Sequence, residues 1–124
     1  MVVEPSEPFV AELWLRGASG PVHARLRAPR VPSDGPLVVA LGGADTDAGT
    51  VTLRLPSDLQ LDDAHAALCW AADHARELGA SSCGLVVAAA GDDAMVLGRR
   101  LAERAAEDGW PDIAQLVLEP SGRR

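Results

Sequence analysis

The hydrophobic and polar positions of this chain follow two periods. In some stretches every second residue is apolar, which is typical of a strand with one buried face, and in others nearly all residues are apolar, as in a central strand. Elsewhere apolar and small residues recur every three or four positions, as on one face of a helix. These patterns predict six strands, over residues 9–16, 22–27, 37–41, 50–55, 83–90 and 113–119, and two helices, over 61–78 and 92–107.

The order of these elements, four strands followed by alternating helices and strands, predicts an α/β fold with parallel strands in its C-terminal part. Residues 8–28 form an N-terminal hairpin, because the link over 17–21 is rich in turn-forming residues. Residues 36–119 form the α/β core, and 120–124 form a disordered tail. We therefore expect one domain over 1–124, with a mixed sheet of about six strands and two helices packed on one face.

Composition narrows the class of protein. Eighteen acidic against eleven basic residues give a net charge of -7, and no basic patch is visible, which argues against binding to nucleic acid or anionic membranes. No apolar run reaches the roughly 18 residues of a membrane span, and no export signal is visible, so we expect a cytoplasmic protein. The basic residues are all Arg, a bias typical of GC-rich bacterial genomes. Cys69 and Cys83 are predicted to be small buried side chains.

Four stretches carry motifs in a familiar order. Pro36–Ala44 reads Pro-Leu-Val-Val-Ala-Leu-Gly-Gly-Ala, Leu53–Pro56 reads Leu-Arg-Leu-Pro, Leu61–Trp70 begins with Leu-Asp-Asp-Ala, and Gly91–Val96 reads Gly-Asp-Asp-Ala-Met-Val. They resemble His-Gly-Gly-Gly, Tyr-Arg-Leu-Ala-Pro, Asp-Asp-Ala and Gly-Asp-Ser-Ala-Gly-Gly in the N-terminal half of the hormone-sensitive-lipase-like branch of the α/β-hydrolases, the bacterial acetyl esterases and lipases. The resemblance covers about residues 20–120. It implies a truncated, partial α/β-hydrolase-like fold.

The nucleophile motif departs from the family's pattern. The resemblance places Asp93 where the family has the Ser that attacks the acyl carbon, and Met95 and Val96 where small glycines allow a sharp turn from strand to helix. The sharp turn is therefore in doubt. The family's acid and His lie on loops after later strands, which this chain lacks, so the resemblance implies no serine triad within one copy.

The oxyanion loop of the family is kept only in part. Gly42 and Gly43 match two of its glycines, whereas its leading His is Leu41 here and its third Gly is Ala44. Because this loop supplies backbone N–H groups to the developing alkoxide, its alteration weakens the expectation of esterase chemistry.

Asp93 has a second interpretation. Dehalogenases and epoxide hydrolases of the wider superfamily use an Asp at this place to form an ester intermediate, and they need a His to activate water afterwards. Asp92 and Asp93 are accordingly weak catalytic candidates. The competing interpretation is that both are acids in the first helical turn, where they complement the helix dipole.

The other polar residues suggest structural roles. His23 is predicted on the outer face of an early strand, His65 is predicted to be half-buried and hydrogen-bonded, and His74 is predicted to be solvated. His65 and His74 point in opposite directions on their helix, so no metal site is expected, and no cofactor is predicted. Asp62 and Asp63 most simply cap the same helix.

A short connection leads to a prediction about the sheet. Only about eight residues, 42–49, separate strands 37–41 and 50–55, whereas a parallel crossover needs a dozen or more. We therefore predict that 44–49 is a hairpin turn and that strand 50–55 runs antiparallel to strand 37–41. The family's covering helix is then missing, one sheet face is bare with apolar side chains at its centre, and a homodimer or partner is expected on the sheet face or edge. Trp14 is the best candidate for a partner contact.

We therefore expect a catalytically degenerate α/β-hydrolase homologue that works by binding, as a dimer, a partner protein or an apolar small molecule. Its candidate binding residues are Gly42, Gly43, Ala44, Asp93 and Trp14. The alternative is a non-serine enzyme, such as a cyclase, lyase or atypical hydrolase of a biosynthetic pathway, whose site lies between protomers and uses Asp92 and Asp93. A third possibility is a fragment with no selected role.

Overall fold

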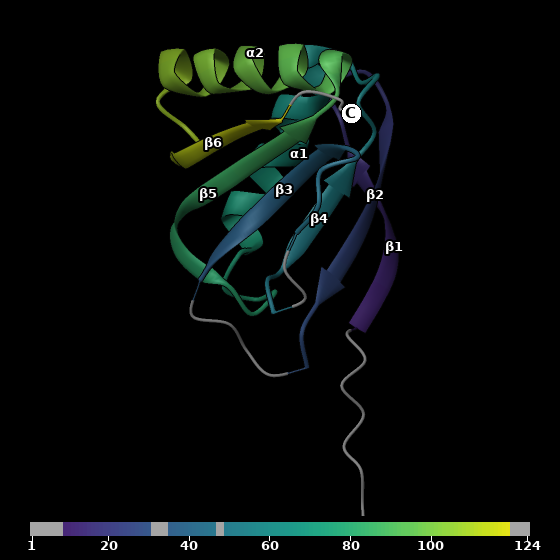
Figure 1. Cartoon of the computed structure of the whole chain (residues 1–124), viewed down its shortest axis with the longest axis vertical. Helices are drawn as coiled ribbons and strands as arrows, with labels where there is room; N and C mark the ends of the chain where they lie inside the picture. Colours follow the sequence, from purple (N-terminus) through teal and green to yellow (C-terminus); the bar gives the residue numbers. More distant parts are fainter. Residues whose placement is uncertain (1–8, 31–34, 47–48, 120–124) are drawn as a thin grey trace, which may run out of the picture.

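The structure is a computed structural model that describes residues 9–30, 35–46 and 49–119. Six strands form one mixed sheet in the order β1-β2-β4-β3-β5-β6, and two helices accompany it (Figure 1). The strands are β1 (Phe9–Arg16), β2 (Pro21–Ala28), β3 (Pro36–Gly42), β4 (Thr52–Leu55), β5 (Ser81–Ala90) and β6 (Ile113–Glu119), and the helices are α1 (Leu61–His74) and α2 (Asp92–Asp108).

The predicted mixed sheet with two helices is confirmed, and most predicted bounds lie within two residues of those in the structure. The largest difference is at α1, which ends at His74 instead of residue 78 and continues as turns. None of the described helices is long and apolar enough to cross a membrane. The predicted tail, 120–124, lies outside the described residues.

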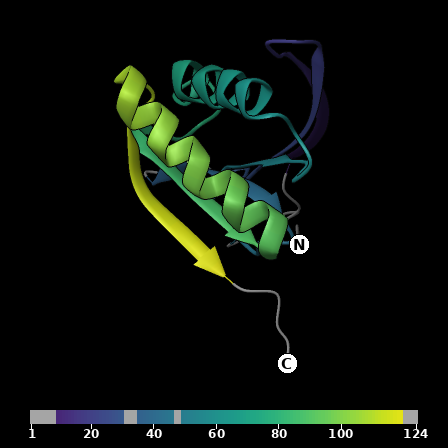
Figure 2. The same ribbon diagram turned by 90° about the horizontal axis from the view of Figure 1, so that it is seen from above.

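Both helices cover the same face of the sheet, as predicted (Figure 2). The alternating pattern of the strands explains this arrangement, because every second side chain points into one continuous core. That core joins β3 and β5 to both helices, and it includes Leu37, Val39, Leu41, Leu85, Val87, Leu68, Leu97 and Leu101, all of them buried.

The hairpin of β1 and β2 is regular over its whole length, with Phe9 opposite Ala28 and Arg16 opposite Pro21. The Gly17 N–H donates to the carbonyl of Gly20 (2.9 Å) and closes the predicted turn. The two strands bury one row of side chains under α1 and leave the other row on the opposite face of the sheet.

The predicted direction of the fourth strand is wrong. β4 runs parallel to β3, with Val38 opposite Thr52 and Leu41 opposite Leu55, and antiparallel to β2 on its other side. The Val38 N–H also donates to the Val51 carbonyl (2.9 Å). A parallel crossover usually contains an α-helix, which accounts for its usual length of a dozen or more residues. Because β4 has only four residues, an extended connection of about 3.3 Å per residue can return along it without a helix.

The second face of the sheet, called the open face below, carries no helix in the part of the chain that the structure describes. Its apolar centre is smaller and better covered than predicted. Ala40, Ala44 and Ala88 are buried there, with Val38, Ala90 and Val117 half-buried around them. The start of the β3–β4 connection covers part of this centre, although residues 47 and 48 of the predicted turn lie outside the described residues.

One buried carboxylate ties the hairpin to α1. Asp63 was expected to cap its own helix, but its Oδ1 accepts the backbone N–H of Ser19 (2.7 Å) and its Oδ2 accepts the Ser19 hydroxyl (2.8 Å). These hydrogen bonds favour the charged form and lower the pKa of Asp63 below its ordinary value. The contact therefore stabilises the fold above the ordinary pKa of an aspartate, and the stabilisation is lost as the pH falls below that value.

We predict that Asp63→Asn lowers the melting temperature near pH 7, because the neutral amide presents only one acceptor to the two Ser19 donors. The difference from the wild type should shrink as the pH falls below the ordinary pKa of an aspartate, because the wild-type carboxylate then becomes protonated at its lowered pKa. Thermal melts from about pH 7 to 2.5 measure this. Asp58→Asn, at an exposed position before α1, serves as the control and should leave the curve unchanged. An Asp63→Asn curve parallel to that of the wild type at every pH would contradict the assignment.

Candidate functional site

The turn between β5 and α2 is sharp despite its bulky residues. Only Gly91 separates the strand from the helix, and it takes a positive φ of 96°. Its carbonyl accepts the Met95 N–H (2.9 Å), and its own N–H donates to the Glu119 carbonyl (3.0 Å). The expected loss of the sharp turn is therefore wrong, because Val96 points outward and is exposed while Met95 is only half-buried.

Asp92 and Asp93 both lie exposed in the first turn of α2. Neither side chain caps the helix with a hydrogen bond. At this position the two carboxylates face the positive end of the helix dipole, as the structural interpretation predicts.

Gly42, from the altered oxyanion loop, lies against this turn. It pairs with Ala90 in the sheet and has a φ of 66°. A Cβ added there would lie 2.6 Å from the Ala90 carbonyl oxygen and 2.9 Å from the Ala94 Cβ, so only glycine fits. Gly43 is exposed and Ala44 is buried. The structure thus brings Gly42 and the Asp93 turn together at the carboxyl ends of β3 and β5.

The three histidines lie elsewhere. His65 is buried, and its Nε2 lies 3.1 Å from the Trp110 carbonyl oxygen. This confirms the hydrogen-bonded role predicted for it. His74 was expected to be solvated, but it is half-buried, stacks on Trp70 with ring centroids 4.6 Å apart, and places Nδ1 2.8 Å from the Trp70 carbonyl oxygen. His23 pairs with Glu12 on the hairpin. Among the described residues, no hydrogen bond or ion pair joins a histidine to Asp92 or Asp93.

Cys69, His65 and Asp108 form a sequence of contacts that resembles a thiol–imidazole–carboxylate arrangement. The Cys69 Sγ lies 3.9 Å from the His65 Nδ1, and the His65 Nε2 lies 3.7 Å from the Asp108 Oδ2. Burial raises the pKa of the Cys69 thiol, and the charges of Asp73 and Asp108 raise it further. Because the thiolate is the nucleophile, this arrangement keeps Cys69 in its unreactive form at neutral pH.

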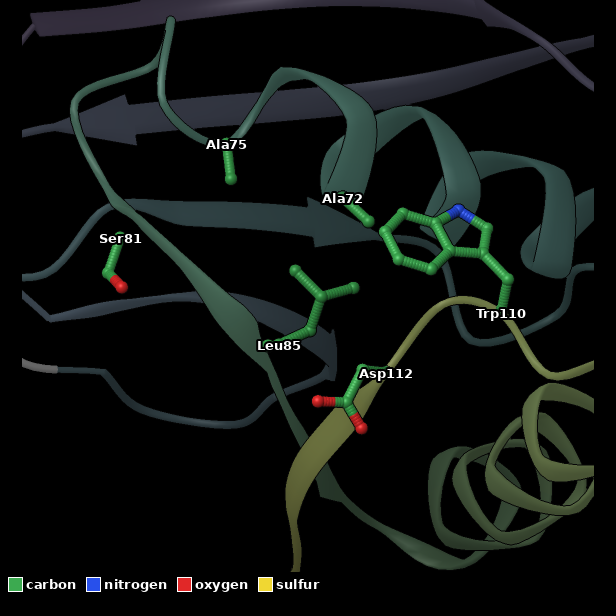
Figure 3. Close-up of a pocket in the computed structure, with 7 residues that line it drawn as sticks. Ala72, Ala75, Ser81, Leu85, Trp110 and Asp112 are labelled. Atoms are coloured by element: carbon green, nitrogen blue, oxygen red, sulfur yellow. The ribbon is translucent and has the colours of Figure 1, made fainter.

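The described residues offer no group of three or more His, Cys, Asp or Glu side chains placed to hold a metal ion. A small cavity of about 30 Å³ lies between α1 and the start of β6, where the Trp110 indole lies beside α1 near Ala72 (Figure 3). A space of that size suits a water molecule and is too small for a substrate.

Two adjoining hollows lie on the open face, and the sequence did not reveal them. One, of about 320 Å³, is lined by Val10, Arg25, Arg27, Thr46, Thr52 and Arg54. The other, of about 580 Å³, shares Arg25 and Arg54 with the first and extends to Glu12, His23, Gly42, Leu55, Pro56 and Ser57. Arg54 lies far from Arg25 and Arg27 in the chain, and the expectation of no basic patch considered charge along the chain alone. The alternate spacing of these arginines on two predicted strands was the sequence signal that could have indicated a basic surface.

No protein-family model matches the sequence, and no curated protein matches it. Solved structures do. A hyperthermophilic esterase from the archaeon Pyrobaculum calidifontis matches with a TM-score of 0.75 and 23% identity, over 91% of this chain and 45% of that chain. A thermostable esterase from Pseudomonas putida matches with a TM-score of 0.72 and 23% identity, over 96% and 46%. A carboxyl esterase from the fungus Tuber melanosporum matches with a TM-score of 0.72 and 16% identity, over 94% and 46%.

The fold is that of a partial α/β-hydrolase domain. The chain spans less than half the length of these esterases, and the identities are low, so the likeness concerns the fold. In this α/β-hydrolase-like chain the glycine at the end of β3 and the glycine of the turn after β5 both have positive φ.

We predict that Gly42→Ala destabilises the protein by about 1–3 kcal/mol, because alanine at a positive φ is strained and its Cβ meets the Ala90 carbonyl. Gly43→Ala is the matched control, since nothing lies within 4 Å of an added Cβ there. Urea unfolding of both variants measures the effect. Equal stability of the two variants would show that the close approach at Gly42 does not constrain the fold.

Proposed function

We propose that this chain is a catalytically degenerate α/β-hydrolase-like protein that acts by binding, as a homodimer. The observation that carries the first part is the exposed carboxylate of Asp93 at the turn after β5, without a histidine beside it among the described residues. A nucleophile at this turn needs a general base, either to activate it or to activate the water that releases the product.

Asp93 alone supports neither esterase step. A carboxylate that attacked a substrate would form a covalent ester, and turnover would then require an activated water. His65 and His74 are held by backbone carbonyls on α1, and His23 is paired with Glu12 on the hairpin. The geometry therefore favours a helix acid over a nucleophile.

The dimer is proposed along the free edge of β1. Large apolar side chains gather on this strand, where Phe9, Val10 and Trp14 are 55%, 50% and 70% exposed. β1 is the first strand of the sheet, so its outer backbone N–H and C=O groups have no strand beside them in the described chain. A strand edge with unpaired backbone groups and exposed apolar side chains favours pairing with a strand of another chain.

β1 also lacks two of the devices that protect an edge, proline and a β-bulge. Its eight residues contain no proline, and its pairing with β2 shows no bulge. A second copy of β1 placed antiparallel around a two-fold axis would extend the sheet and bring the two Trp14 side chains to the same interface. The edge is favoured over the open face because the alanines at the centre of that face are already buried.

We predict no hydrolysis of p-nitrophenyl acetate above the buffer rate, either by the wild type or by Asp93→Ala. The Asp93→Ala variant separates the two interpretations of this residue. Turnover by the wild type that disappears in Asp93→Ala would overturn the binding proposal in favour of a carboxylate enzyme. Equal turnover by both proteins would contradict the proposed loss of catalytic activity, and it would also show that Asp93 takes no part in the reaction.

We predict a dimer by light scattering at micromolar concentration. Trp14→Gln should raise its dissociation constant by at least about tenfold, because a central tryptophan typically contributes 2 kcal/mol or more to an interface. Val96→Gln is the matched control, since Val96 is 53% exposed but lies on α2, and it should leave the dimer unchanged. A monomeric wild type would overturn the dimer, and an equal effect of both variants would exclude the β1 edge.

A further inference from the structure

We propose that Arg25, Arg27 and Arg54 form a binding site for the phosphate or carboxylate group of a small molecule, in the hollow on the open face. The inference names a ligand class for the binding function proposed above and rests on that function for its role. The site itself needs neither the dimer nor the loss of esterase activity.

Strand register brings the three arginines together. β2 and β4 are antiparallel neighbours (Figure 1), and Arg25 lies directly opposite Arg54 while Arg27 lies opposite Thr52. Leu26 and Leu53, the residues between them, are buried in the core under the helices, so the arginines project from the open face. Side chains directly opposite on antiparallel strands have Cβ atoms about 4.5–5.5 Å apart, so the guanidinium groups share one surface.

This concentration of positive charge is not neutralised locally. The chain carries a net charge of -7, yet in the described chain a single carboxylate, Glu12, pairs with this group: its Oε2 lies 3.1 Å from the Arg25 Nε. The same carboxylate also pairs with His23. Like charges placed opposite one another on a sheet repel, so an anion in the hollow would relieve a cost that the free protein carries.

Arg54 and Arg27 have different roles in this site. Arg54 donates through Nη1 to the Gly42 carbonyl (2.8 Å) and through Nη2 to the Ala44 carbonyl (2.7 Å), so its position is fixed while its charge remains. The side chain of Arg27 makes no hydrogen bond or ion pair with any described residue, and its planar group of donors is free to bind an oxyanion in a bidentate manner. Arg27 is therefore the residue whose loss tests the site most directly.

The hollow has the size and the additional donors for such a ligand. Its volume of about 320 Å³ lies within the usual range of small-molecule sites. The hydroxyls of Thr46 and Thr52 lie 3.0 Å apart and line the hollow beside the arginines, so they add polar groups to it. The adjoining hollow of about 580 Å³ continues past Arg54 toward Gly42 and Ser57, so the rest of a ligand would lie there.

Titration of the full chain with inorganic phosphate and with citrate, followed by calorimetry in low-salt buffer, tests the proposal. We expect saturable binding of at least one of the two anions, weakened by roughly tenfold or more in Arg27→Gln and less in Arg27→Lys, which keeps the charge but loses the planar donors. Arg99→Gln, on the exposed side of α2, is the matched control and should bind as the wild type does. Circular dichroism verifies that each variant is folded.

Three results would overturn the site: no saturable binding of either anion, binding unchanged in Arg27→Gln, or equal weakening in Arg27→Gln and Arg99→Gln, which would indicate unspecific attraction. The Trp14→Gln variant separates this proposal from the dimer. Full anion affinity in a Trp14→Gln monomer would show the site to be independent of the interface, and loss of anion binding in that variant would overturn a site formed by one chain alone.

Discussion

The contact of Arg54 with the segment after β3 determines the shape of the second sheet face. Its two hydrogen bonds to the carbonyls of Gly42 and Ala44 direct the chain across Ala40 as soon as β3 ends. A connection held down in this way can return along the short β4 without a helix. The face then keeps small buried residues at its centre, two hollows beside them, and the arginines of β2 and β4 at its margin. The same contact thus joins the end of β3 to β4 and holds one arginine of the proposed anion site in place.

The α/β-hydrolase-like fold of this chain constrains its glycines more than its residue at position 93. Gly42 and Gly91 hold backbone conformations with positive φ where strand ends approach each other, so the scaffold itself demands them. The residue at position 93 projects from the first helical turn into solvent, where the fold places no demand on it. A carboxylate there is compatible with the helix dipole and with every neighbouring contact. The fold is therefore compatible with a carboxylate at this position.

The sequence predicted the elements well because their periods are strong. Alternation located both ends of β1, and the three- and four-residue spacing located the start of α2 and its end to within one residue. The direction of β4 was not predictable from connection length, since that rule describes crossovers that contain helices. The arginine site was missed because residues 25 and 54 meet only through strand register. The stacking of His74 on Trp70 could have been predicted from the sequence, because residues four apart lie on one helix face.

The proposed interface and the proposed anion site are geometrically compatible. Antiparallel pairing of two β1 edges extends the sheet sideways, so the interface would bury an edge and leave the face above β2 and β4 uncovered. A two-fold axis between antiparallel strands is perpendicular to the sheet, and it keeps the same face of both copies on the same side. The two arginine hollows would then open in one direction, separated by the paired hairpins. In a strongly acidic protein this concentrates the uncompensated positive charge on a single surface, while the helices and their carboxylates face away from it.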